Sequence, residues 1–189
     1  MTKTTLALAG LLTLGLLGAA CGDKDDSGGG GDGGGGDGGS AGSDCSDPSV
    51  NPFAGTCVET FLADCFDPAG ECDGTIDMAT GETTMTWSNG ASVQTEVGGG
   101  TPPTVTTTIT GSSGAVCATG TSSYGTGGCA SQTVYVREGD GAQQTWCIAA
   151  DGGMTVSCPG GETVTVTAAQ AQAANQCGMA GSGEPCVFQ

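Results

Sequence analysis

The sequence contains no histidine and very little positive charge. Histidine is the commonest general base and the commonest ligand of zinc and copper, so its absence excludes histidine-dependent triad enzymes and metalloenzymes. Lysine and arginine together number 3 against 20 acidic residues, and the formal net charge is −17. Because nucleic acids and anionic headgroups are bound by clustered lysine and arginine, we expect no nucleic-acid partner.

Large apolar features are also scarce. Aromatic residues make up only 4% of the chain, so a folded core is expected to be thin. The longest apolar stretch, residues 6–17, is about 12 residues long, whereas a membrane-spanning helix needs about 20. The sequence therefore predicts no transmembrane helix, and the stretch needs another explanation.

That stretch has the form of a signal peptide. Lys3 precedes it, and the small residues Gly18-Ala19-Ala20 separate it from Cys21. Residues 17–21, Leu-Gly-Ala-Ala-Cys, resemble the lipobox of bacterial lipoproteins, with the leucine one position further from the cysteine than usual. The resemblance covers the leader alone. It implies cleavage after residue 20, acylation of Cys21 and a membrane anchor; the alternative is an ordinary secretory leader that leaves Cys21 as a free thiol.

The chain divides into a leader at 1–20, a linker at 21–44 and a cysteine-rich β domain at 45–189. The linker is almost wholly glycine, aspartate and serine and contains nothing that could form a core, so we expect a flexible tether. Gly22 follows the lipidated cysteine, where an aspartate would resemble an inner-membrane retention signal. We therefore expect an outer-membrane lipoprotein that faces the periplasm or the cell surface.

The cysteines after Cys21 are even in number, which fits a fully oxidised framework in an extracytoplasmic compartment. No C-x-x-C pair is present, so we expect no metal site and no cofactor. Connectivity does not follow from sequence, but local pairing is the default, with Cys65–Cys72 and Cys147–Cys158 expected. The disulfide candidates are Cys45, Cys57, Cys65, Cys72, Cys117, Cys129, Cys147, Cys158, Cys177 and Cys186.

Short threonine- and valine-rich runs separated by turn residues predict a mainly β fold: an antiparallel meander, as a sheet, sandwich or small barrel, with a short helix at each end. A capping-box pattern at Thr56 starts the first helix, which stops before Pro68. Residues 168–176 predict the second. Asn89-Gly90 indicates a type I′ hairpin. The expected strands are 75–78, 82–88, 91–97, 104–110, 115–118, 132–137, 143–149, 154–158 and 162–167.

Alternation along these strands predicts one apolar and one threonine-rich face. The predicted core is Met85, Trp87, Ala91, Val93, Val97, Val105, Ile109, Val134, Val136, Trp146, Ile148, Val164 and Val166. The predicted polar face carries Thr84, Thr86, Thr104, Thr106, Thr108, Thr110, Thr163, Thr165 and Thr167. Such rows of hydroxyls suit sugars or ice, or reflect only the β propensity of threonine. Tyr124 is expected in a loop, as a contact residue or a partial plug.

Seven carboxylates crowd residues 59–82, where they could bind Ca²⁺ or form a solvated acidic surface; we expect the latter, because no EF-hand spacing is present. They are Glu59, Asp64, Asp67, Glu71, Asp73, Asp77 and Glu82. The expected function is non-catalytic: a membrane-anchored binding or envelope-structural protein with an unknown protein or glycan ligand. No catalytic residue is assigned. The alternative is a carboxylate-dependent hydrolase of cell-wall or environmental glycans.

Overall fold

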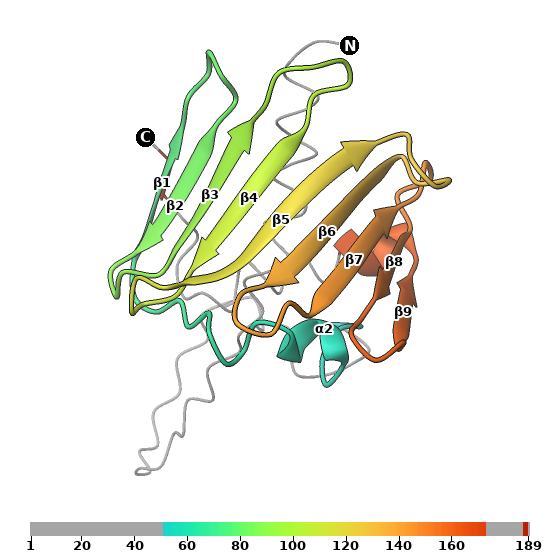
Figure 1. Ribbon diagram of the computed structural model, residues 1–189, viewed down its shortest axis with the longest axis horizontal. Helices are drawn as coiled ribbons and strands as arrows, with labels where there is room; N and C mark the ends of the chain where they lie inside the picture. The colour runs from blue at the N-terminus through green and yellow to red at the C-terminus, as the bar shows by residue number, and fades with distance from the viewer. Residues whose placement is uncertain (1–50, 173–186, 189) are drawn as a thin grey trace, which may run out of the picture.

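The computed structural model describes residues 51–172 and 187–188, and its dominant feature is one ten-stranded sheet (Figure 1). Strands β1 to β9 follow one another as an antiparallel meander, and β10 pairs parallel with β1. The strands are β1 (Cys72–Ile76), β2 (Thr83–Trp87), β3 (Ser92–Val97), β4 (Val105–Thr110), β5 (Val116–Tyr124), β6 (Ser131–Arg137), β7 (Gln143–Ile148), β8 (Met154–Ser157), β9 (Thr163–Val166) and β10 (Val187–Phe188). The predicted mainly β meander is thus confirmed.

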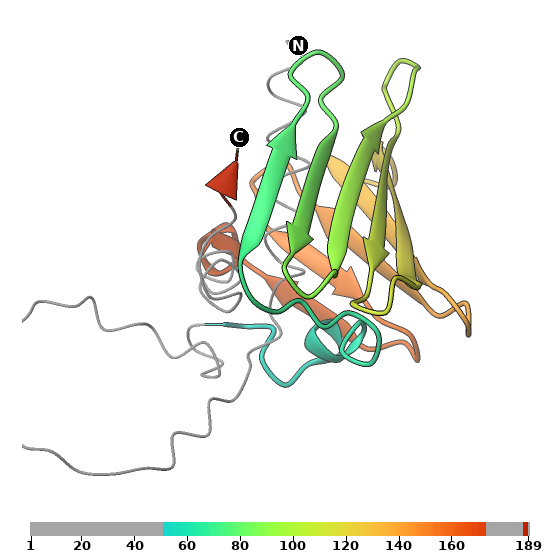
Figure 2. The same ribbon diagram turned by 90° about the vertical axis from the view of Figure 1, so that its left-hand side faces the viewer.

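The sheet is strongly curled, so that β6 to β9 lie behind β1 to β4 in the side view (Figure 2). Helix α2 (Cys57–Thr60) and the chain around it lie under one end of the sheet (Figures 1 and 2). A second helical stretch begins at residue 168, where the second helix is predicted, and is described as far as residue 172. No helix in the described ranges is long and apolar enough to cross a membrane.

Helix α2 is capped as the sequence predicts but ends much earlier. The Thr56 hydroxyl accepts a hydrogen bond from the Val58 amide at 3.2 Å, and the Glu59 carboxylate accepts one from the Gly55 amide at 2.6 Å. After one turn the chain continues in non-helical turns, in which Phe61 and Leu62 are nevertheless buried. The prediction of a longer helix reaching toward Pro68 was wrong, because this segment spreads its apolar residues over the sheet end.

The Asn89-Gly90 hairpin forms, but not with a type I′ turn. The Gly90 amide donates to the Trp87 carbonyl at 2.9 Å, and the Trp87 amide donates to the Ala91 carbonyl at 2.9 Å. Only Gly90 has a positive φ, of 93°. This is a three-residue loop in which a type I turn is followed by a left-handed glycine. The same hydrogen-bond pattern recurs around Gly152 between β7 and β8, where φ is 86°.

The core lies on the inner face of the sheet and is covered by aromatic side chains from residues 51–71, named here the covering segment. The Phe66 ring packs edge-on against Trp87 of β2 at 5.7 Å between centroids, and Phe53 lies 5.7 Å from Trp146 of β7. Trp146 in turn meets Tyr135 of β6 edge-on at 6.5 Å. The covering segment therefore contacts the sheet from β7, through Phe53, to β2, through Phe66.

Most of the predicted core faces inward, but β6 is a correction. Thr133 and Tyr135 are buried on the inner face, and Val134 and Val136 are half-exposed on the outer face. Thr133 is accommodated because its hydroxyl shares a hydrogen bond of 2.8 Å with Ser122. The two valines were predicted to face inward because they are the more hydrophobic pair. Strand pairing instead turns Thr133 and Tyr135 inward.

Two strands differ from the predicted bounds by more than one residue at an end. The first predicted strand, 75–78, is β1 and runs from Cys72 to Ile76. Strand β5 extends far beyond the predicted 115–118, so Tyr124 is its last residue, half-buried, rather than part of a loop. Burial raises the pKa of the Tyr124 phenol. Strand β10 was not predicted, since two residues are too few to show a pattern.

Candidate functional site

The predicted disulfide framework exists, but its pairing is not local. Three bonds join described cysteines: Cys57–Cys158, Cys65–Cys117 and Cys129–Cys147, at sequence separations of 101, 52 and 18. Cys72 is also disulfide-bonded, to a partner outside the described residues. Both expected pairs, Cys65–Cys72 and Cys147–Cys158, were therefore wrong. The candidates Cys45, Cys177 and Cys186, and the lipidation site Cys21, lie outside the described residues.

The Cys147–Cys158 prediction failed because of one turn. It assumed a two-residue turn at Gly152-Gly153, which would place the two cysteines opposite each other. The three-residue loop shifts the register, so Cys147 pairs with Thr155 on the outer face. Cys158 follows Ser157 of β8 and is buried on the inner face. The observed register differs from the predicted one by three residues, and any odd shift exchanges the two faces of a strand, so these sulfurs cannot meet.

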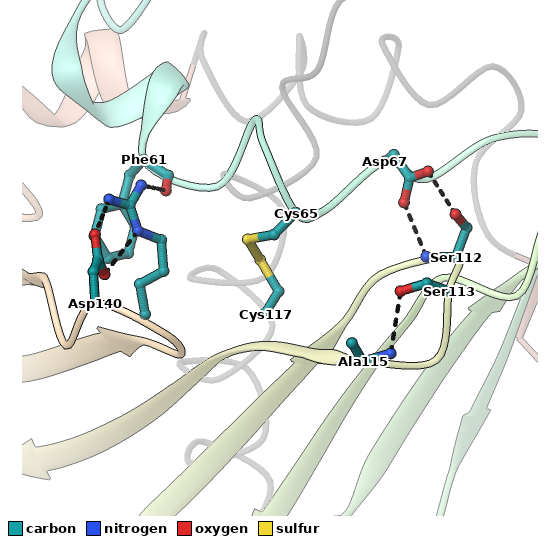
Figure 3. The surroundings of a disulfide bond; sticks show 9 residues. Phe61, Cys65, Asp67, Ser112, Ser113, Ala115, Cys117 and Asp140 are labelled. Atoms are coloured by element: carbon teal, nitrogen blue, oxygen red, sulfur yellow. Dashed lines mark hydrogen bonds and ion pairs between the residues drawn. A yellow bond between two sulfur atoms is a disulfide. The ribbon is translucent and has the colours of Figure 1, made fainter.

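Cys117 reaches Cys65 because β5 contains a bulge. The pairing of β4 with β5 shifts between Ile109 and Thr110, which leaves Cys117 as the extra residue between Val116 and Ala118. A bulge re-aims a side chain, and here both Cys117 and Ala118 are buried in succession. The bond joins the covering segment to the sheet beside two polar contacts (Figure 3).

The first of these contacts is made by Asp67. Its carboxylate accepts hydrogen bonds from the Ser112 amide at 2.9 Å and from the Ser112 hydroxyl at 2.6 Å (Figure 3). These bonds, that of the hydroxyl first, lower the pKa of Asp67. Asp67, which was predicted to belong to an acidic cluster, thus anchors the loop between β4 and β5.

The second contact is made by Arg137 at the end of β6. One guanidinium nitrogen donates to the Phe61 carbonyl at 3.0 Å, and the guanidinium carbon lies 5.5 Å from the centre of the Phe61 ring. The other nitrogens pair with Asp140 (Figure 3). The hydrogen bond from Arg137 lowers the pKa of Asp140 to about 2. The cation therefore serves the fold rather than a ligand.

The remaining carboxylates of residues 59–82 are also spread apart. Glu59 caps α2, and Asp77 accepts hydrogen bonds from the amides of Ala79 and Thr80 at 2.7 and 3.3 Å, which lower its pKa. Asp73 is exposed on β1. Within the part of the chain that the structure describes, no group of three or more acidic or cysteine side chains could hold a metal ion. The acidic stretch is thus divided among local contacts and solvent.

The outer side chains of β4 to β9, named here the threonine face, form the most uniform surface of the described sheet. Cross-strand pairing aligns Thr106, Thr121, Val134, Thr145, Ser157 and Thr163 in one row. The whole face comprises Thr106, Thr108, Thr110, Val116, Thr119, Thr121, Ser123, Gln132, Val134, Val136, Gln143, Thr145, Cys147, Thr155, Ser157, Thr163 and Thr165. All are exposed or half-exposed, and none is charged or aromatic.

Only the outer strands of this face were predicted from the sequence. The prediction identified Thr106, Thr108 and Thr110 of β4 and Thr163 and Thr165 of β9. It missed Thr119 and Thr121 of β5, because the predicted strand stopped before them. Thr145 of β7 and Thr155 of β8 lie within predicted strands but were not included in the predicted face. The alternation of residues 119–123 is a signal that could have found β5, had the bulge at Cys117 not interrupted the pattern.

Comparison with known proteins adds no relative to this picture. No protein-family model, no curated protein and no solved structure matches the chain. Several disulfides in one domain indicate an oxidising, extracytoplasmic location, because cytosolic thiols are kept reduced.

Proposed function

We propose that this protein is a membrane-anchored extracytoplasmic lipoprotein with a non-catalytic binding or envelope-structural role. Acylated Cys21 would hold it in the outer membrane, and the linker at 21–44 would keep the β domain away from the bilayer. The observation that supports this most strongly is the disulfide framework, which needs the oxidising compartment to which the leader directs the chain. Several acyl chains on one residue would make the anchoring stable.

The state of the carboxylates favours a non-catalytic role over glycan hydrolysis. A general acid needs a raised pKa. The three described carboxyl groups with clearly shifted pKa values, Asp67, Asp77 and Asp140, are all shifted downward by hydrogen bonds. Nothing in the described residues specifically supports the hydrolase alternative, and release of reducing sugar from cell-wall glycans by the purified chain would establish it instead.

The anchoring is tested on the chain produced in a bacterial host. Detergent-phase partitioning followed by mass spectrometry should find an N-terminal peptide that begins at Cys21 and carries acyl chains. The Cys21→Ala variant should remain unprocessed or leave the membrane, whereas Ser27→Ala, a matched change in the linker, should behave as the parent does. An unmodified N-terminal peptide from the mature parent protein contradicts the proposal. Protease treatment of intact and permeabilised cells then separates the cell surface from the periplasm.

A further inference from the structure

We propose that the threonine face binds an uncharged polysaccharide; this rests on the proposed binding role and names its ligand class. The observation behind it is a segregation of charge. The chain has a net charge of −17, and the described acidic residues lie at the ends of the sheet or on β1 and β3, such as Asp73 and Glu96. From β4 to β9 the outer surface carries no charged side chain.

The hydroxyls of this face are available to a ligand. Among its described threonines, Thr106, Thr108, Thr119, Thr121 and Thr145 form no side-chain hydrogen bond within the described residues, whereas Thr155 and Thr165 contact each other at 3.4 Å. A hydroxyl both donates and accepts a hydrogen bond. Sugar hydroxyls do the same, so a glycan could form hydrogen bonds with the threonine hydroxyls without burying an unpaired charged side chain.

Charge complementarity selects a neutral polymer over an anionic one. A strongly acidic protein repels anionic polymers, and the threonine face offers no cation to offset that repulsion. A protein partner fits less well, because the face lacks the tryptophan, tyrosine and arginine that anchor protein interfaces. Neighbouring strands of a sheet are typically rotated by about 20–25°, and this sheet is strongly curled (Figure 2), so its hydroxyls do not match the flat lattice of ice. A flexible polysaccharide can follow the twist.

The row from Thr106 to Thr145 gives the geometry of contact. Neighbouring strands are about 4.7–4.9 Å apart, so Thr106 and Thr121 on β4 and β5 lie side by side, with Thr145 on β7 beyond Val134. Val134 adds an apolar contact for the face of a sugar ring. Each hydrogen bond contributes modestly, so affinity should come from many weak contacts along a chain.

The test is native electrophoresis of the full chain, solubilised in a polyoxyethylene detergent, through gels containing dextran, hydroxyethyl cellulose or alginate. We expect retardation by at least one neutral polymer and none by anionic alginate. The triple variant Thr106→Val/Thr121→Val/Thr145→Val removes three hydroxyls with little change in shape and should weaken association about tenfold or more. The control triple variant Thr60→Val/Thr75→Val/Thr101→Val changes exposed threonines away from this face and should bind as the parent does.

A second variant, Thr108→Val/Thr119→Val, removes hydroxyls from the neighbouring row and should weaken association in the same direction, should the triple variant fail to fold. The proposal is overturned if no neutral polymer retards the parent, if alginate retards it equally, or if face and control variants lose the same retardation. Sedimentation should show a monomer; a dimer that the face variants dissociate would assign the face to a second copy. None of these failures bears on the acylation of Cys21, which mass spectrometry reads separately.

Discussion

Replacing Arg137 with methionine should lower the free energy of unfolding by about 2–4 kcal/mol, because this side chain joins the covering segment to β6. Its hydrogen bond to the Phe61 carbonyl has a charged donor, which is worth about 1.5–3 kcal/mol. The cation over the Phe61 ring adds about 0.5–1 kcal/mol. The pair with Asp140 adds little, because it is exposed to solvent. Methionine keeps most of the apolar stem and removes only the cation and its donors.

Urea denaturation of the full chain without reductant measures this loss as a shift in midpoint at constant slope. The matched variant Asp140→Asn removes the exposed charge pair but leaves the Phe61 contacts, so it should cost much less stability than Arg137→Met. Equal losses for the two variants would refute the assigned role of the Phe61 contacts.

The same pair gives a pH dependence. The pKa of Asp140 is about 2 in the folded protein, below its ordinary value of 3.8. A lowered folded-state pKa contributes stability that is fully present above the unfolded-state value. We therefore expect stability to fall between about pH 4 and pH 2, and the Asp140→Asn variant to show a smaller fall over that window than the parent, measured by urea denaturation at each pH.

Two further predictions follow from the packing and the topology. Gly120→Ala places a methyl carbon 2.5 Å from the Tyr135 ring, so it should cost about 1–3 kcal/mol in urea denaturation, and a loss under 0.5 kcal/mol would contradict the packing. Peptide mapping without reduction should recover a Cys72–Cys186 bond, because Cys186 precedes Val187, which pairs in register with the residue after Cys72; a bond from Cys72 to any other cysteine would refute this.

The meander was predictable because its signals are local. Each hairpin is set by a short turn that contains glycine, such as Gly90 or Gly152, and the turns divide the chain into strands of the right length. The hydrogen-bond pattern inside the turn was not predictable from Asn89-Gly90 alone. That detail fixes the register, and the register decides which cysteines share a face.

Disulfide pairing was not predictable because it is a tertiary property. Cys57 and Cys158 are 101 residues apart and meet only once the meander has curled and the covering segment has crossed its end. Cys117 reaches Cys65 through a bulge that no periodic pattern indicates. The threonine face was half predictable for a related reason, since alternation could be seen in β4 and β9 but was interrupted by this bulge in β5.

The β6 register offers a direct test of which face is the core. If Val134 and Val136 point outward, as the structure has them, the double variant Val134→Thr/Val136→Thr should change the free energy of unfolding by no more than about 0.5 kcal/mol, since surface changes rarely do more. Tyr135→Ala should cost about 3–5 kcal/mol, because it removes a buried ring that packs on Trp146.

With the opposite register the two results would exchange. Two buried threonine hydroxyls without partners would cost about 1–3 kcal/mol each, and an exposed Tyr135 could be truncated cheaply. Urea denaturation of both variants separates these cases. The result also reaches the proposed ligand surface, because Val134 lies in the row between Thr121 and Thr145 only if β6 presents its valines outward. A large loss of stability in the double variant would therefore show that Val134 points inward and does not belong to the row on the threonine face.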